Sequence, residues 1–208
     1  MDLTRFQQQL KGTSSKARPL PPVDQWNPDF CGDINLTIAL DGRWFYEGSP
    51  IGRASLVELF ASVLKREGDK YFLVTPVEKV GITVEDTPFL ITQWHIERNE
   101  GGEASEVEQE VESTSDCTYV FTTQTGDTIR LEREDQLELR VPPKAIQDPE
   151  ATPIPYIRVR RNLWARLHQN TYYQLLEQAE ESSDGSNTQF SIQSSGTTFV
   201  LGEILQTP

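Results

Sequence analysis

Short β-type runs recur along the chain; they are rich in β-branched and aromatic residues, and in several of them apolar and polar residues alternate, which is typical of strands that bury one face. The runs cover residues 35–40, 43–48, 70–76, 80–85, 89–97, 118–123, 128–133, 136–141, 156–161, 188–193 and 197–202. Glycine-containing pairs separate three couples of neighbouring runs, at Asp41-Gly42, Gly126-Asp127 and Ser195-Gly196. Because these residue types accept the positive φ angles of tight turns, each pair predicts a β-hairpin.

Two longer segments follow the helical period instead. In the first, apolar side chains at positions 56, 59, 60, 63 and 64 share one helical face. Ser55 and Glu58 have the spacing of a capping box at its start, and Gly68 supplies a stop. The second segment places apolar side chains at positions 172, 175, 176 and 179 on one face, after Thr171 and Gln174 at the same spacing. We therefore predict two amphipathic helices with capping boxes.

These elements divide the chain into two similar halves. Each predicted helix follows two strands and precedes two more, which suggests a duplicated β-β-α-β-β unit. We expect an N-terminal helix and extended tether over 1–25, a first half over 26–97, an acidic loop or linker over 98–116 and a second half over 117–208. The predicted fold class is α+β, with a small, mostly antiparallel sheet and one helix in each half.

Charge is spread unevenly along the chain. The sequence has 32 acidic and 19 basic residues, for a formal net charge of −13. Eight acids and one base lie between Glu97 and Asp116, so this segment alone carries a net charge of −7. Such a stretch buries too little apolar surface to fold alone. The acidic balance opposes nucleic acid or an anionic membrane as the main partner, because phosphate binding needs a dense basic surface.

The cysteine content and the apolar runs indicate the cellular compartment. The two cysteines, Cys31 and Cys117, fit no metal-ligand spacing, and so few cysteines favour a reducing compartment. The N-terminus lacks an apolar core of signal-peptide length, and no run approaches the ~20 apolar residues that span a bilayer. We expect a cytoplasmic protein without membrane insertion, and nothing in the sequence indicates an oligomer, although self-association through strand edges stays open.

Residues 44–53, WFYEGSPIGR, are where the two halves differ. About three extra residues separate the strand from the helix here, relative to the second half. Ser49-Pro50 can cap and start the helix, which would place Arg53 in the first turn, where backbone N–H groups favour an anion. The alternative is a capped helix in which Arg53 pairs with Glu47 or Glu58.

A long stretch of the first half resembles a known family. WNPDFCGDINLTIALDGRWFYEGSPIGRASLVELFASVL and YFLVTPVEKVGITVEDTPF closely resemble the uncharacterised bacterial family called domain of unknown function 1285, and WFYEGSPI and LVTPVEKVGITVED are specific for it. The resemblance implies two similar α+β halves, the second loosely like a pleckstrin-homology fold, with a binding site between them. It implies no established reaction and no cofactor.

Enzyme motifs are missing from the sequence. Neither histidine belongs to an HExxH pair, Ser49 is not in a GxSxG elbow, and no glycine-rich phosphate loop occurs. Glu47, Glu78 and Glu85 at strand ends form a weak candidate metal site without a local ligand motif. Arg158, Arg160, Arg161 and Arg166 form the basic cluster, either for an anion or for ion pairs with the acidic first half or the Glu-rich segment.

The leading hypothesis is a binding or regulatory protein of the signalling type, without cofactor or metal. It recognises a small anionic ligand or a peptide in a cleft between the halves. The expected ligand-binding residues are Trp44, Tyr46, Glu47, Ser49, Arg53, Glu78, Lys79, Glu85, His95, Arg158 and Arg160. The alternative is a cleft enzyme, perhaps hydrolytic, that uses Glu47, Ser49 and His95.

Overall fold

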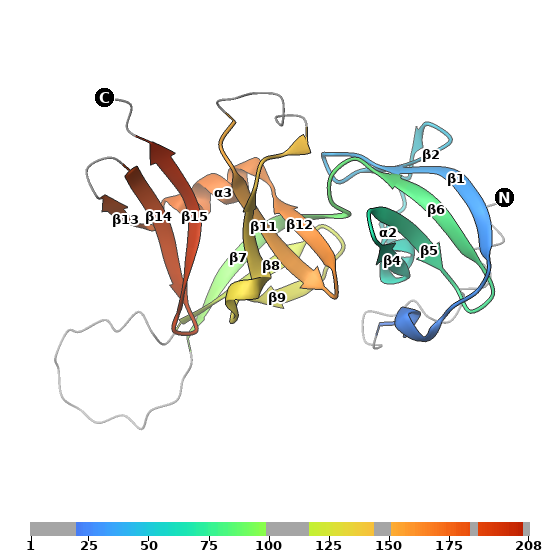
Figure 1. Cartoon of the computed structure of the whole chain (residues 1–208), viewed down its shortest axis with the longest axis horizontal. Coiled ribbons are helices and arrows are strands. Elements are labelled where there is room, and N and C mark those ends of the chain that lie inside the picture. The colour runs from blue at the N-terminus through green and yellow to red at the C-terminus, as the bar shows by residue number, and fades with distance from the viewer. Residues whose placement is uncertain (1–19, 99–116, 144–150, 184–186, 206–208) are drawn as a thin grey trace, which may run out of the picture. The chain divides into compact units, whose positions relative to one another are not determined.

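The computed structural model describes residues 20–98, 117–143, 151–183 and 187–205 of the chain. It divides into two compact units, residues 1–89 and 90–208, which we describe separately (Figure 1). The predicted N-terminal helix, most of the tether and nearly all of the acidic segment lie outside the described residues.

The first unit is built on one six-stranded sheet. Its strands are β1 (Phe30–Ile38), β2 (Trp44–Tyr46), β3 (Ser49–Pro50), β4 (Leu64–Glu67), β5 (Lys70–Val74) and β6 (Lys79–Val84). Their order across the sheet is β3-β2-β1-β6-β5-β4. All neighbouring strands are antiparallel except β1 and β6, the first and last strands, which pair in parallel at the centre of the sheet. A short 3-10 helix, η1 (Val23–Gln25), precedes β1.

Helix α2 (Ala54–Ser62) packs its apolar stripe against this curled sheet (Figure 1). Leu59 and Phe60 are buried, and the Phe60 ring stacks on Trp44 with 6.4 Å between centroids. The periodicity therefore predicted the buried face correctly. The predicted caps were wrong: Arg53 is the N-cap residue, Ser55 lies inside the helix, and the helix ends at Ser62. The apolar residues that follow the helix are buried in strands β4 and β5 and not on further helix turns. The chain therefore enters β4 at Leu64.

Residues 44–51 form a second tight hairpin, and the helix starts only after it, at the N-cap residue Arg53. Glu47 (φ 48°) and Gly48 (φ 75°) turn the chain, and Ser49-Pro50 returns as strand β3 beside β2. The Ile51 N–H donates to the Trp44 carbonyl at 2.8 Å and extends the pairing. Pro50 is tolerated in this position because β3 is an edge strand of the sheet. The extra residues of the first half are thus an added edge strand.

The second unit contains a six-stranded sheet and a three-stranded sheet. The six strands are β7 (Phe89–Arg98), β8 (Cys117–Thr123), β9 (Thr128–Arg130), β10 (Leu137–Arg140), β11 (Ile154–Arg160) and β12 (Leu163–Leu167). They follow the order β10-β11-β12-β7-β8-β9, and the 3-10 helix η3 (Glu134–Gln136) joins the two edge strands β9 and β10. The segment at 89–97, which the sequence analysis placed in the first half, is a central strand of this second sheet.

Helix α3 (Gln169–Leu176) leads from β12 to the three-stranded sheet (Figure 1). That sheet consists of β13 (Glu180–Ser183), β14 (Asn187–Ser194) and β15 (Thr197–Leu205). Ser195 (φ 50°) and Gly196 (φ 76°) both take the left-handed conformation predicted for the β14–β15 turn. The N-cap of α3 is His168, whose Nδ1 accepts the Asn170 N–H, so the predicted Thr171–Gln174 capping box was also wrong.

Among the described residues, each unit has strands before and after one α-helix, which is consistent with duplication. They differ in pairing: strands on the two sides of α2 join one sheet, whereas the strands after α3 form a sheet of their own. Within the described parts of the chain, neither helix has the length and apolar content that crossing a bilayer requires.

Candidate functional site

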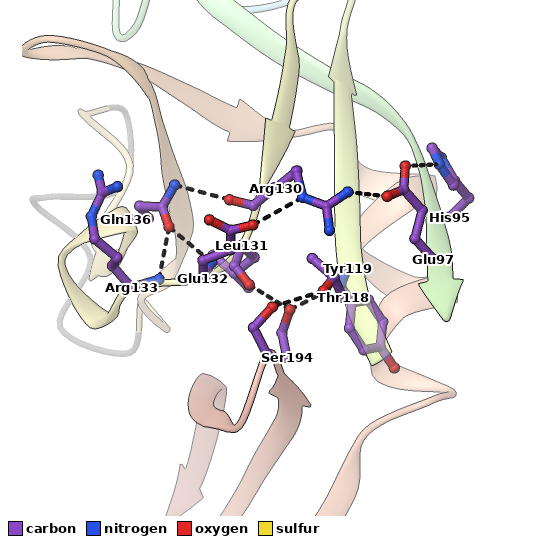
Figure 2. Close-up of polar contacts among 11 residues, drawn as sticks. His95, Glu97, Thr118, Tyr119, Arg130, Leu131, Glu132, Arg133, Gln136 and Ser194 are labelled. Atoms are coloured by element: carbon purple, nitrogen blue, oxygen red, sulfur yellow. Dashed lines mark hydrogen bonds and ion pairs between the residues drawn. The ribbon is translucent and has the colours of Figure 1, made fainter. Parts of the chain in front are cut away.

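Charged side chains from strands β7 and β9 are linked to one another at one side of the six-stranded sheet of the second unit (Figure 2). The guanidinium of Arg130 on β9 lies between two carboxylates. It donates to Glu97 of β7 and, through Nε at 2.9 Å, to Glu132. The bond from Arg130 is the main reason that the pKa of Glu97 lies below its ordinary value. His95 Nε2 lies 3.4 Å from the other oxygen of Glu97.

The side-chain amide of Gln136 holds the turn that follows Arg130. Its oxygen accepts the backbone N–H groups of Glu132 (2.9 Å) and Arg133 (2.8 Å), and its nitrogen donates to the Arg130 carbonyl at 2.9 Å. Gln136 is buried, and its side-chain amide supplies the backbone groups with the hydrogen bonds that a neighbouring strand would otherwise make where the chain leaves β9. This turn also fixes the position of Asp135, whose carboxylate accepts a hydrogen bond from Arg133 Nε at 3.1 Å.

Asp135 connects the turn to a group of stacked aromatic and guanidinium side chains. Arg158 of β11 donates to Asp135 at 2.7 Å, and its Cζ lies 5.1 Å from the centroid of the Trp164 ring on β12. Arg140 of β10 lies 4.1 Å from the same centroid and 5.3 Å from that of Tyr156. We call Arg140, Tyr156, Arg158 and Trp164 the arginine–tryptophan cluster.

Strand register explains how the cluster forms. Arg158 is directly opposite Trp164 in the antiparallel β11–β12 pair, so the two side chains emerge on the same face. The rings of Tyr156 and Trp164 are almost fully buried, at 1% and 5% exposure, whereas the side chains of Arg158 and Arg140 keep 29% and 32%. The guanidinium groups therefore cover the rings and face the solvent themselves.

Each exposed arginine of the cluster already has a carboxylate partner. Arg140 donates to Glu138 through Nε (2.9 Å) and Nη2 (2.6 Å), and Arg158 donates to Asp135. The pKa of Asp135 is lowered by the bond from Arg133 first and by the charge of Arg158 next. The Nε–H of Arg158 is buried and has no acceptor among the described residues. The neighbouring carboxylates thus offset part of the positive charge of the cluster, and its N–H donors outnumber the acceptors found for them.

A second polar arrangement fastens the β14–β15 turn to the same sheet (Figure 2). Ser194 Oγ donates to the Leu131 carbonyl at 2.5 Å and accepts the Tyr119 N–H at 2.9 Å. Next to it, the hydroxyls of Ser195 and Thr118 are 2.7 Å apart. Because Ser194 is fully buried, this contact joins the two sheets and is unavailable to a ligand.

Two family models together match most of the chain. One is described as "Domain of unknown function (DUF1285), N-terminal domain" and matches residues 21–87, and the other as "Protein of unknown function (DUF1285), C-terminal domain" and matches residues 88–201. The chain belongs to the DUF1285 family. The boundary between the DUF1285 models falls within two residues of the division between the two compact units.

Two solved DUF1285 structures are similar to this chain. A DUF1285 family protein from Silicibacter pomeroyi DSS-3 is 36% identical and has a TM-score of 0.71, covering 93% of this chain and 92% of that chain. A DUF1285 family protein from Shewanella baltica OS155 is 29% identical with a TM-score of 0.48, covering 68% and 90%. No curated protein matches the sequence.

The sequence-predicted residues in the first DUF1285 domain are spread over several environments. Trp44 is 2% exposed and belongs to the core, while Ser49 and Arg53 are exposed near the β2–β3 hairpin. Tyr46 is half-buried on β2 opposite Leu36. Among the described residues, Arg53 forms no ion pair, so the predicted pairing with Glu47 or Glu58 is not found there.

The acidic residues of this domain have structural partners. Glu47 accepts from the Asn35 side chain at 3.1 Å, and Glu85 accepts the Leu40 N–H at 3.0 Å. Glu78 is buried in the β5–β6 turn, where Thr75 accepts its N–H. Lys79 donates to Glu67 at 3.1 Å and lies over the Phe72 ring. Among the residues described, no group of three or more His, Cys, Asp or Glu side chains is placed to hold a metal ion.

In the second DUF1285 domain the predicted residues separate into two environments. Arg158 belongs to the arginine–tryptophan cluster, whereas Arg160 is turned toward Asp127 in the β8–β9 turn and is mostly buried. Burial lowers the pKa of Arg160, and the charge of Asp127 opposes this. Sequence reasoning missed Arg140, Trp164 and Asp135 as parts of a site.

Proposed function

We propose that the protein is a non-enzymatic binding or regulatory module and that the second domain contacts an anionic ligand or peptide through the arginine–tryptophan cluster. The observation that carries the proposal is that two guanidinium groups lie within about 5 Å of the centroid of one buried tryptophan ring. Stacking on an aromatic face fixes the orientation of a guanidinium, so less side-chain entropy is lost when it binds a carboxylate or phosphate.

The geometry of the predicted catalytic residues supports binding over catalysis. His95 is exposed beside Glu97, and Glu47 is engaged with Asn35, so each has a partner that accounts for it. The hydrolytic alternative, which takes Glu47 and Ser49 from the first domain and His95 from the second, stays a prediction. The likeness of the second domain to a pleckstrin-homology fold is also kept as a proposal: a curled antiparallel sheet followed by a helix supports it, and the three strands after α3 are additional.

The proposal is tested by thermal unfolding of the full chain with a panel of anions that includes inorganic phosphate, citrate and acidic peptides. At least one anion is expected to raise the unfolding midpoint of the second domain, since a ligand stabilises the state that binds it. The double variant Arg140→Gln/Arg158→Gln removes this effect.

A matched control is available in the first domain. Arg43 also lies over an aromatic ring, at 5.3 Å from the Phe45 centroid, and pairs with Asp41 at 2.6 Å, but among the described residues no second guanidinium lies over that ring. The variant Arg43→Gln keeps the ligand response. An anion response that survives the double variant, or no response to any anion, contradicts the proposal.

A further inference from the structure

The geometry of the arginine–tryptophan cluster limits the spacing of charged groups in its ligand as well as the sign of their charge. Its two guanidinium carbons lie 4.1 Å and 5.1 Å from one ring centroid, which limits the distance between them. They are therefore no more than about 9 Å apart, and carboxylates on alternate residues of an extended peptide, about 7 Å apart, fall within this limit.

Because alternate residues of an extended peptide fit within this limit, we infer that the cluster recognises an extended acidic peptide segment with carboxylates on alternate residues, one for Arg140 and one for Arg158. The inference rests on the proposed function and names its ligand. In an extended strand, alternate side chains lie on one face, so both carboxylates of such a segment point toward the cluster. Carboxylates on adjacent residues point to opposite faces and cannot reach both arginines together.

The charge around the cluster favours carboxylates over nucleic-acid phosphates. Glu138 pairs with Arg140, Asp135 is shared between Arg158 and Arg133, and the chain as a whole has a net charge of −13. A densely charged polyanion would meet carboxylates beside both arginines and a chain that is acidic as a whole. Singly charged groups fit the site because each guanidinium has five N–H donors, and Glu138 and Asp135 engage only some of them.

Asp135 and Glu138 compete with the peptide for the same donors. Both acids are half-exposed and lie beside their arginines on the η3–β10 segment, so they act as intramolecular substitutes for the carboxylates of the peptide. Removing one of them should free donors without disturbing the buried rings. The substitution Asp135→Asn is therefore expected to tighten peptide binding, which general damage to the fold would not do.

The experiment measures peptide binding to the full chain by NMR, following the indole N–H resonance of Trp164, which is assigned by its loss in Trp164→Phe. The probe is the synthetic peptide acetyl-Thr-Glu-Thr-Glu-Thr-amide. The matched peptides are one with glutamine in place of glutamate, one with the two glutamates adjacent, and a free straight-chain dicarboxylate. The alternating peptide is expected to bind with a Kd of roughly 0.1–1 mM at low salt, and added salt weakens it.

The variants sharpen the comparison. Arg140→Gln or Arg158→Gln is expected to weaken binding by about tenfold or more, Asp135→Asn to strengthen it by about threefold to tenfold, and Arg43→Gln to leave it unchanged. If the adjacent-glutamate peptide or the free dicarboxylate binds as tightly as the alternating peptide, the extended-peptide inference fails, while anion binding by the cluster stands. If neither arginine variant changes the binding of any anion, both the extended-peptide inference and the proposed function are wrong.

Discussion

Ser194 offers a direct test of how the two sheets of the second domain are held together. Its Oγ bridges the Tyr119 N–H and the Leu131 carbonyl, and the side chain is fully buried. The substitution Ser194→Ala leaves one buried donor and one buried acceptor without a partner. Each such group costs about 1–3 kcal/mol, so the expected loss in the free energy of unfolding is about 2–6 kcal/mol.

Two measurements can detect this loss in the free energy of unfolding. Urea unfolding gives the change in stability, and native-state hydrogen exchange reports on the Tyr119 amide, whose protection is expected to fall more than that of its neighbours in β8. Because the chain has two domains, exchange in β8 isolates the second domain from the first.

The matched control is Ser191→Ala on the same strand. Ser191 is half-buried in β14 and no hydrogen bond of its side chain is found among the described residues, so its loss is expected to change stability by less than about 0.5 kcal/mol. If Ser194→Ala and Ser191→Ala differ by less than about 0.5 kcal/mol, the reasoning about the buried hydroxyl is refuted.

Two further predictions concern packing and pH. A methyl group added at Gly202 would lie 2.8 Å from the Tyr172 hydroxyl, which donates to the Leu201 carbonyl. We therefore expect Gly202→Ala to destabilise the domain by about 1–3 kcal/mol in thermal unfolding, and the loss to shrink in a Tyr172→Phe background, which lacks the hydroxyl. In the first domain, the hydrogen bond from Lys79 holds the pKa of Glu67 below its ordinary value of 4.5. The stabilisation is present above pH 4.5 and is lost as the pH falls through the lower, folded pKa, so Glu67→Gln should flatten the acid limb of a stability–pH curve; an unchanged limb contradicts the assignment.

Local patterns in the sequence predicted much of the secondary structure. Strand alternation and helical period depend on nearby residues, and the Ser195-Gly196 hairpin has the backbone angles expected of it. At Asp41-Gly42 only the glycine has a positive φ, because the loop is one residue longer and the Ala39 N–H bonds to the Arg43 carbonyl. The turn residues predicted the hairpin but could not determine its loop length.

Features that depend on distant residues were not predictable. The capping-box spacing at Ser55 and at Thr171 recurs by chance in first turns, so it misplaced both helix starts. The arginine–tryptophan cluster combines β10, β11 and β12, and only the register of these strands brings Arg140 over Trp164. Nothing in the local sequence around Arg140 indicates that neighbour.

The parallel pairing of β1 with β6 also has a consequence for synthesis of the protein. The central pair of the first sheet joins the strand that ends at Ile38 to a strand that is complete only at Val84. On the ribosome, β1 and β2 can form their hairpin early, but β1 keeps one open edge until the rest of the domain has emerged. Long-range pairing of this kind slows folding and exposes nascent strand edges. The first domain is therefore expected to complete its sheet in a late, single step, and stalled chains that end before Val84 should remain protease-sensitive throughout β1.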